Sequence, residues 1–173
     1  MSNDTGRVFP IILTLIIIVI IVYLFATIKQ PYVECSKSFT DDYGIVVREN
    51  IITTFGGNKI NEMKVTKTII LPDKYSKEKY INSIKFSLEN SLDYLGKKNV
   101  KYEVFNNKII VRLTVSNNET IILNNIEFIE NDGLQIKINS NTKSSDVIAL
   151  KVGDNYTQGK LMTRLKNNGY VCK

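Results

Sequence analysis

The chain has 173 residues, a net charge of +6, two cysteines and no histidine. The absence of histidine excludes the Ser-His-Asp and Cys-His catalytic arrangements and every metal site with a histidine ligand. Two cysteines that lie far apart in the sequence also exclude a four-cysteine zinc site. The composition therefore predicts no catalytic, cofactor-binding or metal-binding residue.

The N-terminal part of the chain contains one uninterrupted apolar stretch, residues 8–28, which Arg7 and Lys29 bracket. A helix of that length rises roughly 30 Å, the thickness of the hydrocarbon core of a bilayer. The preceding residues 1–7 are nearly neutral and no cysteine directly follows the stretch, so a cleaved signal peptide and a lipoprotein signal are both disfavoured. The sequence predicts a transmembrane helix at 8–28, in contact with the lipid bilayer, and one folded domain at 29–173.

The two cysteines, Cys35 and Cys172, lie at opposite ends of this domain. A disulfide between them would close a loop of roughly 140 residues and stabilise the domain by about 4–5 kcal/mol in the chain-entropy model. Such a bond persists outside the cytosol, whereas two separate buried thiols are the alternative. Lysine and arginine are almost balanced across the apolar stretch, so the cysteines decide the orientation. We expect a single-pass protein of the cell membrane, with residues 1–7 in the cytoplasm and the domain outside.

The domain begins with signals for a three-stranded antiparallel meander. A strand at 32–39 ends in a turn at 41–44, and an alternating strand at 45–55 ends in a hairpin turn at Gly56-Gly57-Asn58. A return strand follows this turn and ends at Pro72-Asp73. The residues of the second strand and of the return strand that we expect to point inward are Ile45, Val47, Ile51, Phe55, Met63, Val65, Ile69 and Leu71.

An amphipathic helix follows, with Ser76 as its expected N-cap and Gly96 as its C-terminal cap. Its apolar stripe consists of Ile81, Ile84, Leu88, Leu92 and Leu95. Further alternating strands are expected at 100–104, 109–115, 121–129 and 134–138, then a polar loop at 139–145 and a short helix at about 156–167. The predicted fold class is α+β: an N-terminal transmembrane helix, then one domain of antiparallel β-meanders packed on an amphipathic helix, with a short C-terminal helix.

Acidic residues supply two weak candidates for a cation site. Asp41 and Asp42 could form half of a calcium site, but no acidic residue recurs at the required spacing, so a turn is favoured. Glu127, Glu130 and Asp132 cluster near a turn and could bind a cation weakly, although a solvated loop face is the more usual role of such a cluster.

The order of these elements and the C-terminal sequence Leu-Lys-Asn-Asn-Gly-Tyr, residues 165–170, resemble small Gram-positive lipoproteins of the YehR type. The resemblance covers nearly all of residues 32–173. It implies a fold and a location in the cell envelope, and it implies no reaction, because that family has no settled activity. A lipidated cysteine usually holds those proteins, and the apolar stretch would replace it here.

These observations favour a membrane-anchored, extracytoplasmic binding or structural module that is not an enzyme and whose ligand is unknown. The basic domain suits an anionic envelope polymer or a protein partner. The positive charges are scattered and do not interleave with aromatic residues, which argues against nucleic acid. The alternatives are an envelope-acting enzyme that uses two carboxylates and the ectodomain of a viral membrane protein.

Overall fold

A computed structural model describes residues 13–22, 31–94, 100–116, 118–123, 126–131, 133–138 and 148–173. The chain divides into two units, Met1–Pro31 and Tyr32–Lys173, and each is considered by itself.

In the first unit the described residues are 13–22, which are helical, and Pro31. Within the part of the chain that the structure describes, no helix combines the length and the apolar character needed to cross a membrane. The predicted transmembrane helix at 8–28 is therefore wrong for the described residues, and its remaining residues lie outside them. The fold class is corrected to an α+β domain built mainly of antiparallel sheet.

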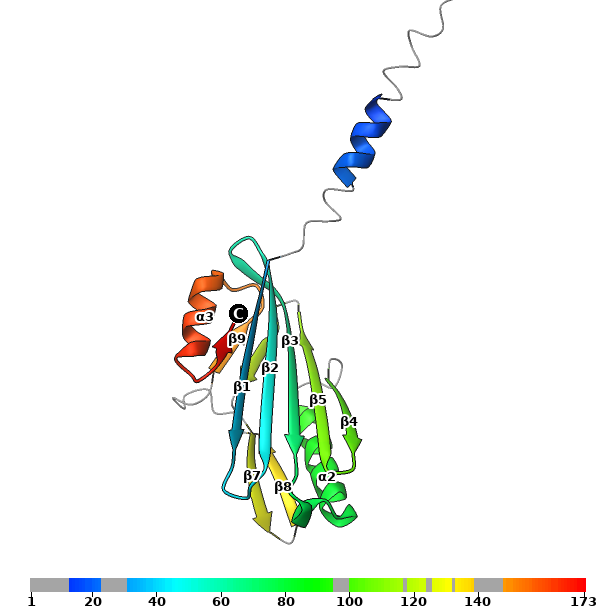
Figure 1. Cartoon of the computed structure of the whole chain (residues 1–173), viewed down its shortest axis with the longest axis vertical. Helices are drawn as coiled ribbons and strands as arrows, with labels where there is room; N and C mark the ends of the chain where they lie inside the picture. The colour runs from blue at the N-terminus through cyan, green and yellow to red at the C-terminus, as the bar shows by residue number, and fades with distance from the viewer. Residues whose placement is uncertain are drawn as a thin grey trace, which may run out of the picture. The chain divides into compact units, whose positions relative to one another are not determined.

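The second unit is built on one six-stranded antiparallel sheet with the strand order β10-β1-β2-β3-β5-β4 (Figure 1). Its strands are β1 (Tyr32–Thr40), β2 (Val46–Gly56), β3 (Lys59–Ile70), β4 (Val100–Phe105), β5 (Lys108–Val115) and β10 (Val171–Cys172). Strand β5 pairs with β3 on one side and with β4 on the other, so β4 forms one edge of the sheet. The two-residue strand β10 forms the other edge, beside β1.

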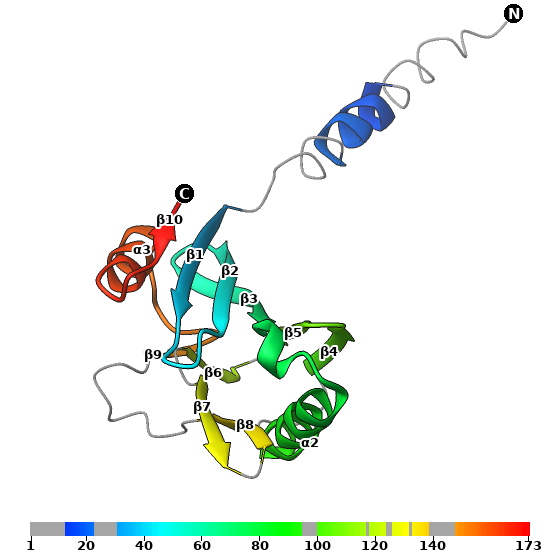
Figure 2. The ribbon, with the colours of Figure 1, turned by 60° about the horizontal axis from the view of Figure 1, so that its bottom comes forward.

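The remaining elements pack on the inner face of this sheet. They are the short 3₁₀ helix η1 (Asp73–Tyr75), the helices α2 (Glu78–Tyr94) and α3 (Gln158–Lys166), and two ribbons. One ribbon pairs β6 (Thr120–Leu123) with β9 (Ile148–Lys151), and the other pairs β7 (Ile126–Asn131) with β8 (Gly133–Ile138). Figures 1 and 2 show α3 and β9 toward one end of the sheet, and α2, β7 and β8 toward the other.

Two apolar clusters form the core, one toward each end of the long strands. The first joins Cys35, Ile51 and Val65 of the sheet to Leu161 and Leu165 of α3. The second joins sheet residues to α2 and to the β7–β8 ribbon. Its members include Val47, Ile69, Ile84, Leu88 and Leu134. Period-two alternation explains the sheet side of both clusters, because alternate residues of a strand point to the same face.

Several predicted elements are confirmed. The strands at 32–39 and 45–55 correspond to β1 and β2, and the hairpin turn has Gly57 at φ 63°, a conformation that favours glycine. All eight residues that were expected to point inward from the second strand and the return strand are buried. The C-terminal helix also forms, with the Thr157 side chain accepting a hydrogen bond from the Lys160 backbone N–H as its N-cap.

Other predicted elements are wrong. The strand expected at 121–129 is split between β6 and β7, which pair with different partners, because two separate clusters must be covered. Strand β9 was not predicted. Ser76 ends η1 and its hydroxyl donates to the Asp73 carbonyl, so it does not cap α2, which begins at Glu78. Leu95, Gly96 and the loop at 139–145 lie outside the described residues, as does the Leu92 side chain.

Candidate functional site

The inner face of the sheet carries a row of charged residues between the two apolar clusters. Lys37 of β1 lies opposite Glu49 of β2, and Glu49 lies opposite Lys67 of β3. We call these three residues the charged row. Their neighbours along each strand on this face are apolar, so the row interrupts an otherwise hydrophobic surface.

The centre of the charged row is a buried ion pair. The Lys67 Nζ lies 3.5 Å from Glu49 Oε1, and the two side chains are 11% and 2% exposed. Lys37 Nζ donates a 2.9 Å hydrogen bond to the Asn168 carbonyl and lies 5.6 Å from the centre of the Tyr170 ring. Burial removes hydration from each of these charges, so the attraction within the pair is offset by desolvation.

Tyr170 connects the C-terminal segment to the charged row. Burial, the negative charge of Glu49 and a hydrogen bond to the Glu49 carboxylate raise the pKa of Tyr170 far above its ordinary value. The phenol therefore stays protonated over the whole physiological range and donates to Glu49. This contact ties the C-terminal segment to β2.

The opposite, outer face of the same strands carries a polar surface. Its residues are Ser36, Ser38, Arg48, Asn50, Thr66 and Thr68, which we call the polar block. They form two cross-strand rows, each with a nitrogen-bearing side chain on β2 between hydroxyl side chains on β1 and β3. Ser38, Arg48 and Thr68 form one row, and Ser36, Asn50 and Thr66 form the other.

The polar block lines a hollow of about 450 Å³. Lys37, Glu49, Gly169 and Val171 complete its lining. Gly169 and Val171 belong to the C-terminal segment, which thus supplies part of the lining beside β1. The hollow is large enough for a small ligand or for one residue of a polymer.

Neighbouring charges on this part of the sheet are mostly paired. Glu34 Oε2 lies 3.2 Å from Lys173 Nζ, and Glu34 Oε1 accepts a 3.2 Å hydrogen bond from the Asn50 amide. On the outer face of β5 and β4, Arg112 lies 2.5 Å from Glu103. Arg48 is exposed, and no carboxylate is seen within ion-pair distance of it among the described residues.

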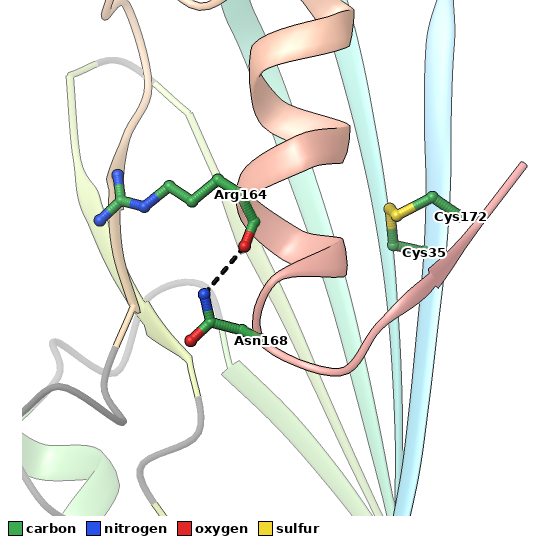
Figure 3. Close-up of a disulfide and its surroundings, with 4 residues drawn as sticks. All are labelled: Cys35, Arg164, Asn168 and Cys172. Atoms are coloured by element: carbon green, nitrogen blue, oxygen red, sulfur yellow. Dashed lines mark hydrogen bonds between the residues drawn. A yellow bond between two sulfur atoms is a disulfide. The ribbon is translucent and has the colours of Figure 1, made fainter.

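The predicted disulfide is confirmed: Cys35 of β1 is bonded to Cys172 of β10 (Figure 3). The Cα atoms of the two cysteines are 4.0 Å apart. The adjacent residues Glu34 and Lys173 exchange both backbone hydrogen bonds, at 3.2 and 2.9 Å. The cysteines therefore occupy a non-hydrogen-bonded pair, the position where antiparallel strands bring Cα atoms closest. The alternative of two separate thiols is wrong.

The disulfide holds the segment that completes the hollow. Figure 3 shows the Asn168 side chain directed at the end of α3, where its amide donates a 2.8 Å hydrogen bond to the Arg164 carbonyl. The Asn168 carbonyl accepts from Lys37, as described above, and the chain then reverses at Gly169, where φ is 83°. The segment is thus fixed on one side by α3 and on the other by the bond to β1.

The acidic candidates form no metal site. Asp41 Oδ1 accepts hydrogen bonds from the backbone N–H groups of Tyr43 and Ile45, at 3.0 and 2.7 Å, so Asp41 closes the predicted turn. Glu130 Oε2 accepts a 2.5 Å hydrogen bond from the Tyr75 hydroxyl, and Glu127 is exposed. Asp132 lies outside the described residues, and within them no group of three potential ligands comes together.

No family model matches this chain, and it matches neither a curated protein nor a solved structure. The fold and the site therefore define its class by themselves: a disulfide-closed α+β domain with a hollow at the polar block of its main sheet. The resemblance to small Gram-positive lipoproteins stays a prediction.

Sequence reasoning missed both the charged row and the polar block. A signal for the charged row was present, because Glu49 and Lys67 fall at inward positions of strands whose other inward residues are mostly apolar. The polar block has a weaker signal, since serine, threonine and asparagine are common on any solvated strand face. Its recognition needed the strand register, which brings six residues from three strands together.

Proposed function

We propose that the domain at 32–173 is a non-catalytic binding module that works outside the cytoplasm and holds its ligand on the polar block. The observation that carries this proposal is the hollow of about 450 Å³, which is lined mainly by residues of three neighbouring strands that have polar side chains. Ligand sites in proteins are typically concave and place a few polar groups so that they converge on the ligand.

The chemistry of the polar block supports binding over catalysis. Its serine, threonine, asparagine and arginine side chains donate and accept hydrogen bonds, but none of them carries a carboxylate, an imidazole or a thiol. A general base is therefore lacking among these six residues. The carboxylate that contacts them, Glu34, accepts a hydrogen bond from Asn50 and forms an ion pair with Lys173. Glu49 is buried on the inner face, beside Lys67 and Tyr170. This placement argues against an enzyme that acts through a pair of carboxylates.

The disulfide supports a location outside the cytoplasm, because reducing compartments keep most cysteines as thiols. The bond also fixes the segment with Gly169 and Val171 that completes the hollow. The proposal applies equally to a protein of a bacterial envelope and to the outer domain of a viral protein.

Site-specific crosslinking in native cells tests the proposal. A photoreactive amino acid at position 66, inside the polar block, should give a covalent adduct in the full chain. The matched control is position 114, which pairs with Lys64 on the same sheet but lies outside the polar block. Adducts of equal yield at both positions, or at neither, would contradict the proposal.

A further inference from the structure

We propose that the polar block binds a phosphate group, with Arg48 as its charged contact. This inference rests on the proposed function and names the class of ligand. The group could belong to a free phosphate or to a phosphate-bearing polymer, and both sources present the same tetrahedral oxyanion.

Arg48 differs from the other arginines of the described residues in what it contacts. Arg112 is paired with Glu103, and Arg164 donates to the hydroxyl of Tyr156. Arg48 is exposed at the centre of three strands, with Ser38 and Thr68 opposite it in register. Arg48 thus brings a guanidinium with five N–H donors to the residues that line the hollow, and no described carboxylate lies within ion-pair distance of it.

The hydroxyl groups around Arg48 suit an anion with several oxygens. Residues directly opposite on antiparallel strands have Cβ atoms about 4.5–5.5 Å apart, so Ser38 of β1 and Thr68 of β3 flank Arg48 on the same face of the sheet. Ser36, Ser38, Thr66 and Thr68 supply four such hydroxyls. A phosphate offers three or four acceptor oxygens to these donors, whereas a carboxylate offers two. The number of donors therefore favours phosphate.

The local charge balance also favours an anion. The charged residues that line the hollow or lie directly beneath it are Lys37, Arg48, Glu49 and Lys67, three cations and one carboxylate, which gives a net charge of +2. Glu34 also lies beside the polar block, where it accepts a hydrogen bond from Asn50, and its ion pair with Lys173 balances its charge. An approaching phosphate would thus meet a net positive charge at the polar block.

Titration of the full chain with inorganic phosphate, followed by backbone amide chemical shifts, tests the inference. Shifts should be confined to residues of the polar block and to Gly169 and Val171. Arg48→Gln should weaken binding by at least about tenfold, because a hydrogen bond to a charged group is lost. The matched control Arg112→Gln removes a paired arginine from the same face and should change the affinity less than about twofold.

Three further probes separate the outcomes. Polyphosphate that binds more tightly than inorganic phosphate, with the same Arg48 dependence, would support a polymer as the source of the group. If acetate binds as tightly as phosphate, the preference for phosphate is overturned. If Arg48→Gln and Arg112→Gln lose equal affinity for phosphate, the binding is unspecific electrostatic attraction and the inference is overturned. Dextran is a neutral polymer. If dextran produces shifts at the polar block and phosphate produces none, the inference is overturned and the proposed function stands. Absence of shifts with every probe, together with no adduct at position 66, would overturn both.

Discussion

Removal of the Glu49 carboxylate should destabilise the domain strongly, because it leaves the Lys67 ammonium in the interior without this counter-ion. At 3.5 Å and an effective dielectric constant of about 20, the attraction between the two charges is about 5 kcal/mol before desolvation is counted. Breaking a buried pair by removing one partner typically costs about 3–5 kcal/mol. We therefore expect Glu49→Leu to lower the free energy of unfolding by about 3–5 kcal/mol.

Removing the second charge should restore part of this stability, about 2 kcal/mol. In Glu49→Leu/Lys67→Met both ions are replaced by apolar side chains, so the desolvation cost disappears together with the attraction. The remaining deficit should be about 1–3 kcal/mol, because the buried hydroxyl of Tyr170 loses its acceptor. Adding Tyr170→Phe should then bring the triple variant close to the wild-type stability.

Urea denaturation of the full chain, followed by circular dichroism, measures these differences as a mutant cycle. The coupling energy between positions 49 and 67 should be at least about 2 kcal/mol, in the range measured for directly interacting residues. If Glu49→Leu and the double variant are equally unstable, the two charges do not interact and the buried ion pair is refuted.

Three further predictions concern the rest of the domain. Reduction of the disulfide should lower the free energy of unfolding by about 2–5 kcal/mol, since it releases a loop that spans 137 positions; a change below about 1 kcal/mol in urea denaturation would contradict this. Leu88→Ala, in the core, should lower the free energy of unfolding by about 2–5 kcal/mol. Phe86→Ala, on the exposed side of α2, should lower it by less than about 0.5 kcal/mol, and equal losses would mean that the Leu88 side of α2 does not face the core. The folded-state pKa of Tyr170 is raised above the unfolded value of about 10, so the unfolded state loses this proton first and stability should fall above about pH 10. Tyr170→Phe should weaken that fall, and an unchanged dependence from about pH 8 to about pH 11 would contradict the assignment.

The local elements of the domain could be predicted because each has its own signal in the sequence. Strands β2 and β3 alternate clearly, the turn between them is marked by glycine and asparagine, and α3 has a threonine N-cap. The disulfide followed from the positions of Cys35 and Cys172 at the two ends of the domain.

The register of the long hairpin was harder to predict, because a β-bulge shifts it between Thr54 and Phe55. Without that bulge Glu49 would lie opposite Thr66, and the charged row would not form. One signal for the bulge exists: Ile60 and Met63 are both buried although their spacing is odd, so β3 must change face between them. The polar block depends on the same shift, which explains why neither feature emerged from single-strand patterns.

The arrangement of the sheet was beyond sequence reasoning for a different reason. Pairing of β5 with β3, and of β10 with β1, joins residues far apart in the chain, and no local pattern encodes such contacts. Strands β6 and β7 are separate because they pair with different strands, β9 and β8. These partners lie elsewhere in the chain, so the apolar residues of β6 and β7 alone predict one continuous strand.

The most direct test of a disulfide-closed module that works outside the cytoplasm is peptide mapping of the full-length protein from its native cells. Free thiols are blocked at lysis, and the digest is analysed by mass spectrometry without reduction. We predict one peptide pair linked through Cys35 and Cys172 of a single chain and no blocked thiol at either position. Recovery of both cysteines as blocked thiols would contradict the proposal and place the domain in a reducing compartment.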